Sequence, residues 1–278
     1  MRGRSLSGAA LSGKIRICLA GATGWVGRGL APAIAEAPDL ELVSAVARSQ
    51  AGKPLSEAIG DPRLNLRVIG SVEEALATPC DVLVDYTSPS AVAAHTLAAI
   101  ARGVRVVIGT SGLTEEDFAV IDAAARAAGV GVLAAGNFAI TAVLLQRFAE
   151  LAAAQIPHWE IIDYGKAAKP DAPSGTAREL AARLANVGQP RLAHRIEETH
   201  GAREARGAQI EGTPVHSVRL PGFVSSIEVL FGLPDERLSI RHDSGSGAGP
   251  YVAGTLLGIR KVGSFIGLRR GLDSVMEL

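Results

Sequence analysis

Residues 15–27 read IRICLAGATGWVG, and they contain the strongest indication of the fold class. Its apolar first part, Ile15–Ala20, is typical of a buried β-strand. The strand leads directly into Gly21, Gly24 and Gly27, which have the spacing G-x-x-G-x-x-G. Glycines at this spacing allow a tight turn and a close approach of the backbone to a neighbouring group. The stretch therefore predicts the first strand and turn of a parallel α/β sheet.

The chain continues from these glycines in a helical pattern over Val26–Ala37, although Pro32 removes one helical hydrogen bond and should bend that helix. Short β-branched runs then alternate with Ala-rich segments of helical period, and this alternation predicts a Rossmann-type doubly wound parallel sheet. We expect its further strands at Leu42–Ala47, Arg67–Ile69, Asp81–Tyr86, Arg105–Ile108 and Gly131–Ala135, and its further helices at Val72–Ala77, Ala91–Arg102, Glu115–Ala128.

The pattern changes after Gly136 to that of an α+β domain with a mixed or antiparallel sheet. We expect helices at Ile140–Ala153, Ala177–Leu184 and Tyr251–Gly263, and strands at Trp159–Tyr164, His216–Leu220, Ile227–Phe231 and Arg237–His242. The last helix should return to the first domain. The predicted organisation is a flexible N-terminus (1–13), a dinucleotide-binding Rossmann domain (14–136 and 242–278) and a substrate-binding and oligomerisation domain (137–241).

Composition excludes several classes of partner. Lys plus Arg and Asp plus Glu both number 28 in 278 residues, so the chain has no net field to attract nucleic acid or a membrane surface. No apolar run is long enough to span a bilayer, and we expect a cytoplasmic protein. The two cysteines lie in or beside apolar runs, where Cys usually packs as a small hydrophobe, so we expect neither a disulfide nor a metal site.

The glycine motif is the predicted site for the pyrophosphate of a dinucleotide, because unpaired N–H groups at a helix N-terminus favour an anion. The cofactor-binding residues expected from it are Gly21, Ala22, Thr23, Gly24, Trp25, Val26 and Gly27. Arg48 follows the second strand, where a carboxylate would hold the ribose of NAD and an Arg accommodates the 2′-phosphate of NADP. We therefore predict NADPH as the cofactor, with NADH still possible and a solvated surface Arg as the alternative.

Two polar turns follow the predicted fourth and fifth strands, at the edge where an open α/β sheet binds its ligands. They contribute Tyr86 and Thr87, and Gly109, Thr110 and Ser111. Small polar residues there suit a nicotinamide ring and its ribose. Ordinary turn chemistry explains each of them equally well when it is taken alone.

Residues 166–177, KAAKPDAPSGTA, form the most specific stretch of the chain. Ser174, Gly175 and Thr176 open a helix, and free N–H groups with two hydroxyls there would bind a carboxylate. Lys166 and Lys169 place two cations just upstream, so a dianionic substrate could be held at two points. The alternative is a capped helix with solvated lysines.

From Lys14 onward, the chain resembles the dihydrodipicolinate reductase family. The resemblance lies in the order of the motifs GATGWVG, DYT, GTSG, GNFAI, KPDAPSGTA and HSVR. The resemblance implies a tetrameric enzyme of lysine and diaminopimelate biosynthesis, which transfers a hydride from NAD(P)H to a cyclic imine dicarboxylate and gives tetrahydrodipicolinate. It further implies that Lys169 holds a substrate carboxylate, with Ser174, Gly175 and Thr176 on the other carboxylate and residues 109–112 near the nicotinamide.

One departure from the family concerns the proton donor. Gly165 and Lys166 stand where the family has a pair of histidines, yet a reductase must protonate the atom that receives the developing charge. Lys166 is the first candidate for this acid and Tyr164 the second. The departure leaves two alternatives open, a diverged imine reductase with another substrate and an NADPH-binding protein without turnover. The retained Lys169 and DAPSGT block argue against the second of these.

Overall fold

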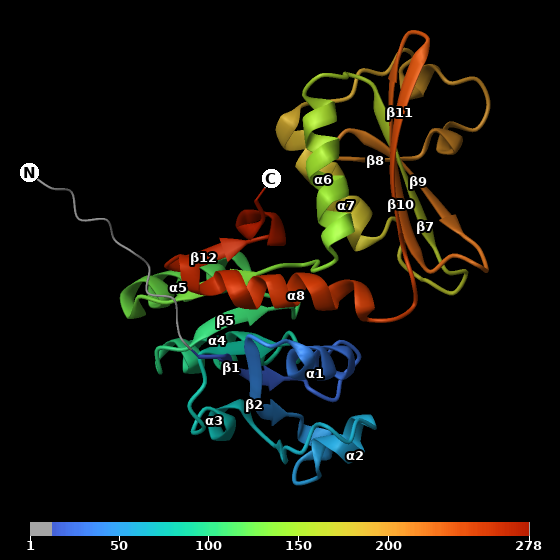
Figure 1. Cartoon of the computed structure of the whole chain (residues 1–278). Coiled ribbons are helices and arrows are strands. Elements are labelled where there is room, and N and C mark those ends of the chain that lie inside the picture. The colour runs from blue at the N-terminus through green and yellow to red at the C-terminus, as the bar shows by residue number, and fades with distance from the viewer. Residues whose placement is uncertain (1–12, 278) are drawn as a thin grey trace, which may run out of the picture. The chain divides into compact units, whose positions relative to one another are not determined.

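The computed structural model describes residues 13–277, so all but the last residue of the predicted flexible N-terminus lie outside it (Figure 1). The chain forms two compact units. The first contains the described residues up to Phe138 together with those from Tyr251 onward, and the second contains Ala139–Pro250. Within the described chain, no helix combines the length and the apolar character needed to cross a membrane.

A seven-stranded parallel sheet forms the centre of the first unit, with the order β12-β6-β5-β4-β1-β2-β3. Its strands are β1 (Ile15–Ala20), β2 (Leu40–Val46), β3 (Val68–Ile69), β4 (Val82–Asp85), β5 (Arg105–Ile108), β6 (Gly131–Ala134) and β12 (Gly267–Arg270). The predicted Rossmann-type sheet is thus confirmed. The edge strand β12 was not predicted, because its sequence GLRR carries exposed arginines and no apolar alternation.

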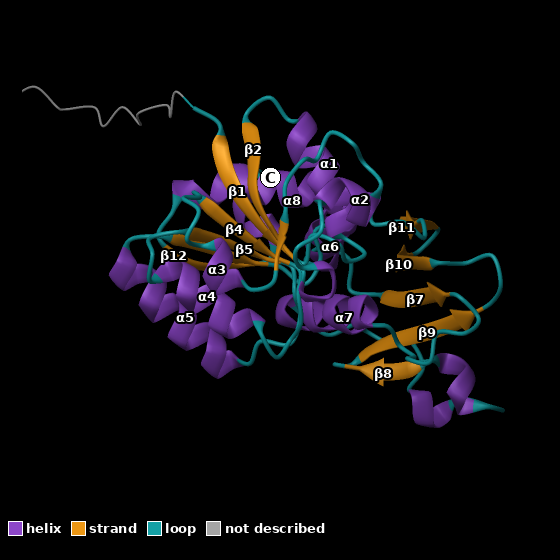
Figure 2. Ribbon diagram, turned by 90° about the horizontal axis from the view of Figure 1, so that it is seen from below, coloured by secondary structure: helices purple, strands orange, loops and turns teal. Residues whose placement is uncertain are grey.

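Helices cover both faces of this sheet (Figure 2). They are α1 (Gly27–Glu36), α2 (Leu55–Ile59), α3 (Val72–Ala75), α4 (Val92–Ile100), α5 (Glu115–Ala128) and α8 (Gly249–Lys261). Pro32 lies inside α1, which continues through it for a further turn to Glu36. The buried strands read as almost continuous apolar runs, as a sheet covered on two faces requires.

The second unit has a five-stranded mixed sheet with the order β11-β10-β7-β9-β8, as predicted for its class. Its elements are α6 (Ile140–Ala153), β7 (Trp159–Gly165), α7 (Gly175–Val187), β8 (Ala208–Ile210), β9 (Thr213–Arg219), β10 (Ser225–Leu233) and β11 (Glu236–Ser244). Only β7 and β9 pair in parallel, and the other pairs are antiparallel. Leu145 and Leu180 of the two helices pack with Trp159, Ile161 and Phe231 of the sheet.

The crossings between the units differ slightly from the predicted boundaries. The first comes at Phe138 instead of Gly136, and the second after Pro250 instead of before His242. The second difference has a simple cause, since β11 keeps its pairing with β10 as far as Ser244. Residues 242–250 therefore group with the second unit.

Candidate active site

The glycine motif forms a tight turn between β1 and α1. Gly21 has φ 85°, and a Cβ on it would lie 2.2 Å from the carbonyl oxygen of Tyr86. A Cβ on Gly27 would lie 2.1 Å from the carbonyl oxygen of Gly21, so neither position admits a side chain. Gly21 and Ala22 donate their N–H groups to the Val46 carbonyl. These two N–H groups are therefore used within the fold.

Three N–H groups of the same turn stay open toward a ligand. Those of Thr23, Trp25 and Val26 have no acceptor within residues 13–277. They lie at the N-terminus of α1, where unpaired N–H groups suit a pyrophosphate. Trp25 is 58% exposed and packs edge-on against Tyr251, with 5.4 Å between the ring centroids.

A cavity of about 490 Å³ opens beside this turn. Gly21, Gly24, Arg48, Tyr86 and Thr87 line it, as do residues 70–73 and His95. The guanidinium of Arg48 forms no hydrogen bond or ion pair with another described residue, so it is open to an anion. Sequence reasoning missed Glu73 in this cavity, because the sequence separation from Arg48 gives no sign that the two share a wall.

Tyr86 and Gly109 form one packed unit. The phenol of Tyr86 shares a hydrogen bond of 2.7 Å with Thr255, and burial raises the pKa of this phenol. A Cβ on Gly109 would lie 2.1 Å from the Tyr86 ring. Packing against this ring therefore explains why position 109 is a glycine.

The Asp85 carboxylate, at the end of β4, organises the two polar turns. Asp85 has no exposed surface, and its Oδ1 accepts hydrogen bonds from Thr87 N (2.9 Å), Thr87 Oγ1 (2.8 Å) and Thr110 Oγ1 (2.7 Å). Its Oδ2 lies 2.8 Å from His95 Nδ1. Ser111, which follows Thr110, makes no hydrogen bond to Asp85 in the described chain. Sequence reasoning missed His95, and the only available signal was an aspartate that ends a buried strand.

The charges of this cluster stabilise one another. Burial opposes the ionisation of Asp85, but the hydrogen bonds from His95, Thr87 and Thr110 outweigh it and hold the pKa of Asp85 below its usual range. The hydrogen bond to Asp85 raises the pKa of His95 against the opposing effect of burial. Asp85 is therefore an ionised carboxylate within the core.

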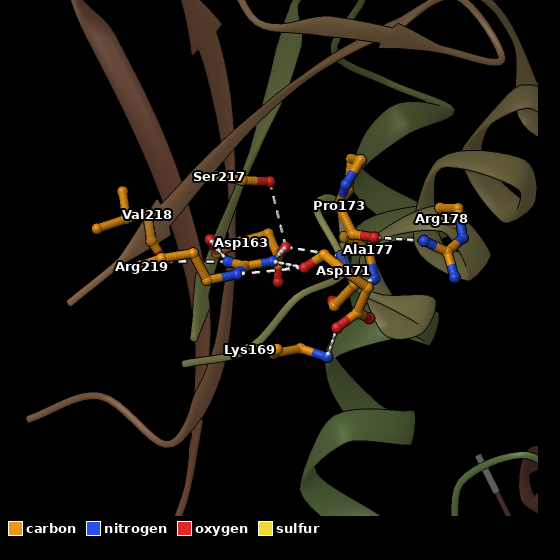
Figure 3. A network of polar contacts seen from close by, with 10 residues as sticks. Asp163, Lys169, Asp171, Pro173, Ala177, Arg178, Ser217, Val218 and Arg219 are labelled. Atoms are coloured by element: carbon orange, nitrogen blue, oxygen red, sulfur yellow. Dashed lines mark hydrogen bonds and ion pairs between the residues drawn. The ribbon is translucent and has the colours of Figure 1, made fainter. Parts of the chain in front are cut away.

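A second buried carboxylate, Asp163 of β7, lies at the start of α7 in the other unit (Figure 3). Its Oδ2 accepts hydrogen bonds from Ser174 N (2.8 Å) and Arg219 Nη2 (2.7 Å). Arg219 also donates to the Asp171 carbonyl (2.7 Å), so it joins β9 to the loop before α7. Within the described residues, Asp85 and Asp163 are the two buried carboxylates, and each lies at a predicted site.

This network gives Ser174 two partners within the fold. Its N–H is taken by Asp163, and its hydroxyl accepts from Ala177 N (3.2 Å) as the cap of α7. Ser174 is 6% exposed and serves the fold in both interactions. The N–H groups of Gly175 and Thr176 have no acceptor among the described residues, so these two positions remain open to a ligand.

Lys166 and Lys169 lie on one turn after β7, where Lys169 N donates to the Lys166 carbonyl at 3.0 Å. Lys169 Nζ lies 2.5 Å from Asp171 Oδ1, and this contact holds the pKa of Asp171 below its usual range. Lys166 is exposed, and its ammonium has no hydrogen bond or ion pair within the described chain. The Lys169 ammonium thus has an internal partner, whereas the Lys166 ammonium has none among the described residues.

Gly165 lets two cationic side chains lie against β7. A Cβ on Gly165 would be 3.0 Å from Lys169 Cδ and 3.2 Å from Arg219 Cδ, so a larger residue would require these two side chains to shift by a few tenths of an ångström.

Tyr164 lies on the opposite face of β7 from Asp163 and Gly165, because side chains alternate along a strand. Its hydroxyl donates to Glu228 Oε2 at 3.0 Å, and the Arg241 guanidinium covers its ring at 4.7 Å. Burial and the neighbouring Glu228 raise the pKa of Tyr164. The structure therefore does not bring Tyr164 together with Lys169.

No group of three metal-binding side chains occurs within residues 13–277.

Comparisons with known proteins agree along nearly the whole chain. The family profile "Dihydrodipicolinate reductase, N-terminus" matches residues 15–138, and "Dihydrodipicolinate reductase, C-terminus" matches residues 141–275. The 4-hydroxy-tetrahydrodipicolinate reductase of Desulfitobacterium hafniense is 37% identical over 266 residues, which is 95% of this chain and 99% of the relative. That of Synechocystis sp. is 39% identical over 270 residues, covering 94% and 98%.

A solved structure gives the same result. Dipicolinate-bound dihydrodipicolinate reductase from Paenisporosarcina sp. TG-14 is 34% identical, with a TM-score of 0.85 over 95% of this chain and 100% of the other. An amine dehydrogenase from Mycobacterium smegmatis shares the fold, with a TM-score of 0.65 at 16% identity over 96% and 97% of the two chains.

Proposed function

The chain belongs to the dihydrodipicolinate reductase family, and we propose that it reduces 4-hydroxy-tetrahydrodipicolinate to tetrahydrodipicolinate with a nicotinamide cofactor. The observation that carries the proposal is the network around Lys169. It combines a partly exposed ammonium with the open N–H groups of Gly175 and Thr176, which suits the carboxylates of such a substrate.

The cofactor supplies the hydride when it is bound. The open N–H groups of Thr23, Trp25 and Val26 would hold its pyrophosphate, and Arg48 would hold the 2′-phosphate of NADPH. Glu73 in the same cavity is suited to a ribose hydroxyl, so NADH should still bind, with lower affinity.

Lys169 would exchange its Asp171 partner for a substrate carboxylate. That exchange costs little, because the side chains of Lys169 and Asp171 are 25% and 39% exposed and the pair is partly hydrated. Arg219 keeps the loop before α7 in place during the exchange, through its contacts with Asp163 and the Asp171 carbonyl.

Lys166 is the proposed proton donor. Its ammonium has no partner among the described residues and it shares a turn with Lys169, whereas the Tyr164 hydroxyl is directed toward Glu228 on the other face of the sheet. A free ammonium can give a proton to the substrate once the hydride has arrived.

A second candidate function is the reduction of a different imine carboxylate. The observation that favours it is Gly165, which stands where the family resemblance implies a histidine and where a larger side chain would contact Lys169 and Arg219 closely. We also propose, from the family resemblance alone, a cytoplasmic homotetramer in which the second unit contributes the substrate site and the subunit contacts. Light scattering of the purified protein tests the subunit number.

The experiment for the main proposal is an assay of the purified chain with NADPH and freshly generated 4-hydroxy-tetrahydrodipicolinate. Rapid oxidation of NADPH supports the proposal. No oxidation with this substrate, together with oxidation in the presence of other cyclic imine carboxylates, supports the second candidate. Binding of NADPH without turnover of any imine refutes both.

A further inference from the structure

The second unit contains a cavity of about 350 Å³ at the end of its sheet opposite to the proposed substrate site. Trp159 at the start of β7 and Gly232 near the end of β10 line this cavity. Strand β7 runs roughly 20 Å from Trp159 to Gly165, and the Lys169 side chain lies against Gly165. The cavity is therefore separate from the lysines that follow β7.

Gly232 keeps part of this cavity open. A Cβ on Gly232 would meet no other atom within 4 Å, and the backbone there is outside the left-handed region, so a side chain would fit without strain. Side chains alternate along β10, so position 232 shares a face with Leu230, which also lines the cavity. Leu192 and Ala193 add further apolar surface. The cavity thus offers unfilled space beside an apolar wall.

The charges around the cavity are mainly positive. Three guanidiniums line it, those of Arg191, Arg206 and Arg237. Glu160 is the single carboxylate among the described residues that line it, and both of its oxygens are occupied. Its Oε1 accepts from Arg206 Nη2 at 2.6 Å, and its Oε2 lies 2.7 Å from His216 Nε2. Three positive charges against one negative charge leave an excess of two, carried by Arg191 and Arg237.

The two excess guanidiniums are available to a ligand. Both side chains are exposed, and neither guanidinium has a hydrogen bond or ion pair with another described residue. The backbone of Arg191 is nevertheless fixed to the start of β7, because its N–H donates to the Pro157 carbonyl at 2.6 Å and its carbonyl accepts from His158 Nδ1 at 2.6 Å. A guanidinium presents a planar fork of N–H donors that matches a carboxylate or a phosphate.

We propose that this cavity is a second ligand site, which binds a small organic dianion through Arg191 and Arg237 and accommodates the apolar part of that ligand over Gly232. Its volume suits a small molecule and is too small for a dinucleotide or a folded peptide segment. A phosphomonoester and a dicarboxylate share the required chemistry. The excess positive charge disfavours a cationic ligand.

Trp159 provides a local signal for the test. The chain has two tryptophans, so the full-length Trp25→Phe variant keeps Trp159 as its single one. Its emission is followed during titration with butyl phosphate, with glutarate and with butyrate, which carries one charge. At least one dianion should give a saturable change, and the one that binds more tightly identifies the class of ligand. Butyrate should bind about tenfold more weakly or worse, because it loses a charge-assisted contact.

Substitutions in this background separate the charge from the space. Arg191→Gln and Arg237→Gln should each weaken dianion binding about three- to tenfold, the lower range for a charge-assisted contact because both side chains are exposed. Gly232→Ile keeps every charge but fills the cavity, and it should weaken binding about tenfold or more. Arg195→Gln is the matched control, since Arg195 lies on the same loop, outside the cavity, with Glu197 at 3.5 Å. It should leave the dissociation constant unchanged.

Three results overturn the proposal. The first is an emission of Trp159 that does not respond to either dianion in the millimolar range. The second is a loss of affinity in Arg195→Gln equal to that in Arg191→Gln, which would reduce the effect to general surface charge. The third is a response that disappears in Lys169→Ala, because the signal would then come from the other end of β7. A response that persists in Lys169→Ala and is lost in Gly232→Ile supports the second site.

Discussion

Lys169→Ala separates the two interactions that this ammonium makes. Its ion pair with Asp171 is partly exposed, so losing it should cost at most about 1 kcal/mol of stability. Loss of a charge-assisted bond to a substrate carboxylate costs more, roughly 1.5–3 kcal/mol. KM for the substrate should therefore rise about ten- to hundredfold, while the thermal unfolding temperature changes by only a few degrees.

Initial rates of NADPH oxidation over a range of substrate concentrations give KM, and thermal unfolding of the same samples gives stability. Asp171→Asn is the matched control, because it removes the same ion pair but keeps the ammonium. KM for the substrate should equal that of wild type or be lower, because Asp171 no longer competes with the substrate for Lys169. A Lys169→Ala enzyme with the KM of wild type would refute the assignment of Lys169.

Three further predictions concern the proton donor, the cofactor and the buried charges. Lys166→Ala should lower kcat by about 10²–10⁴ with little change in KM and should remove the basic limb of the pH–rate profile; an unchanged kcat would exclude Lys166 as the acid. Arg48→Ala should weaken NADPH binding about tenfold or more and leave NADH binding unchanged, as titration of Trp25 fluorescence would show; an equal loss for both cofactors would contradict the phosphate contact. Because the pKa of His95 is raised in the fold, its contribution to stability is complete below its ordinary pKa of about 6.5 and is lost as the pH rises through the raised value. Thermal unfolding across this range should show that decline in wild type and a flatter profile in His95→Gln, and identical profiles would be inconsistent with it.

The fold was predictable from the sequence where a local pattern determines it. The glycine turn after β1 and the alternation of apolar strands with Ala-rich helices carry their own signal over a few residues. The edge strands β8 and β12 carry none, because most of their residues are exposed and only their pairing partners make them strands. The extension of β11 to Ser244 likewise depends on β10.

The site was predictable only for residues within motifs. Ser174 was expected to face a ligand, but Asp163, eleven residues earlier, takes its N–H. The faces of β7 separate Tyr164 from Lys169, although the two lie close together in the chain. The link between His95 and Asp85 spans a strand end and a helix turn, so it becomes visible only once both are folded.

Deuterium transfer is the sharpest test of the proposed reduction of 4-hydroxy-tetrahydrodipicolinate. The chain is incubated with 4-hydroxy-tetrahydrodipicolinate and NADPH that carries deuterium at the transferred position of C4, and the product is analysed by mass spectrometry. We expect tetrahydrodipicolinate that is heavier by one deuterium, formed at a rate that falls in Lys169→Ala at low substrate concentration. Unlabelled product, or no product while the family's substrate is present, would contradict it.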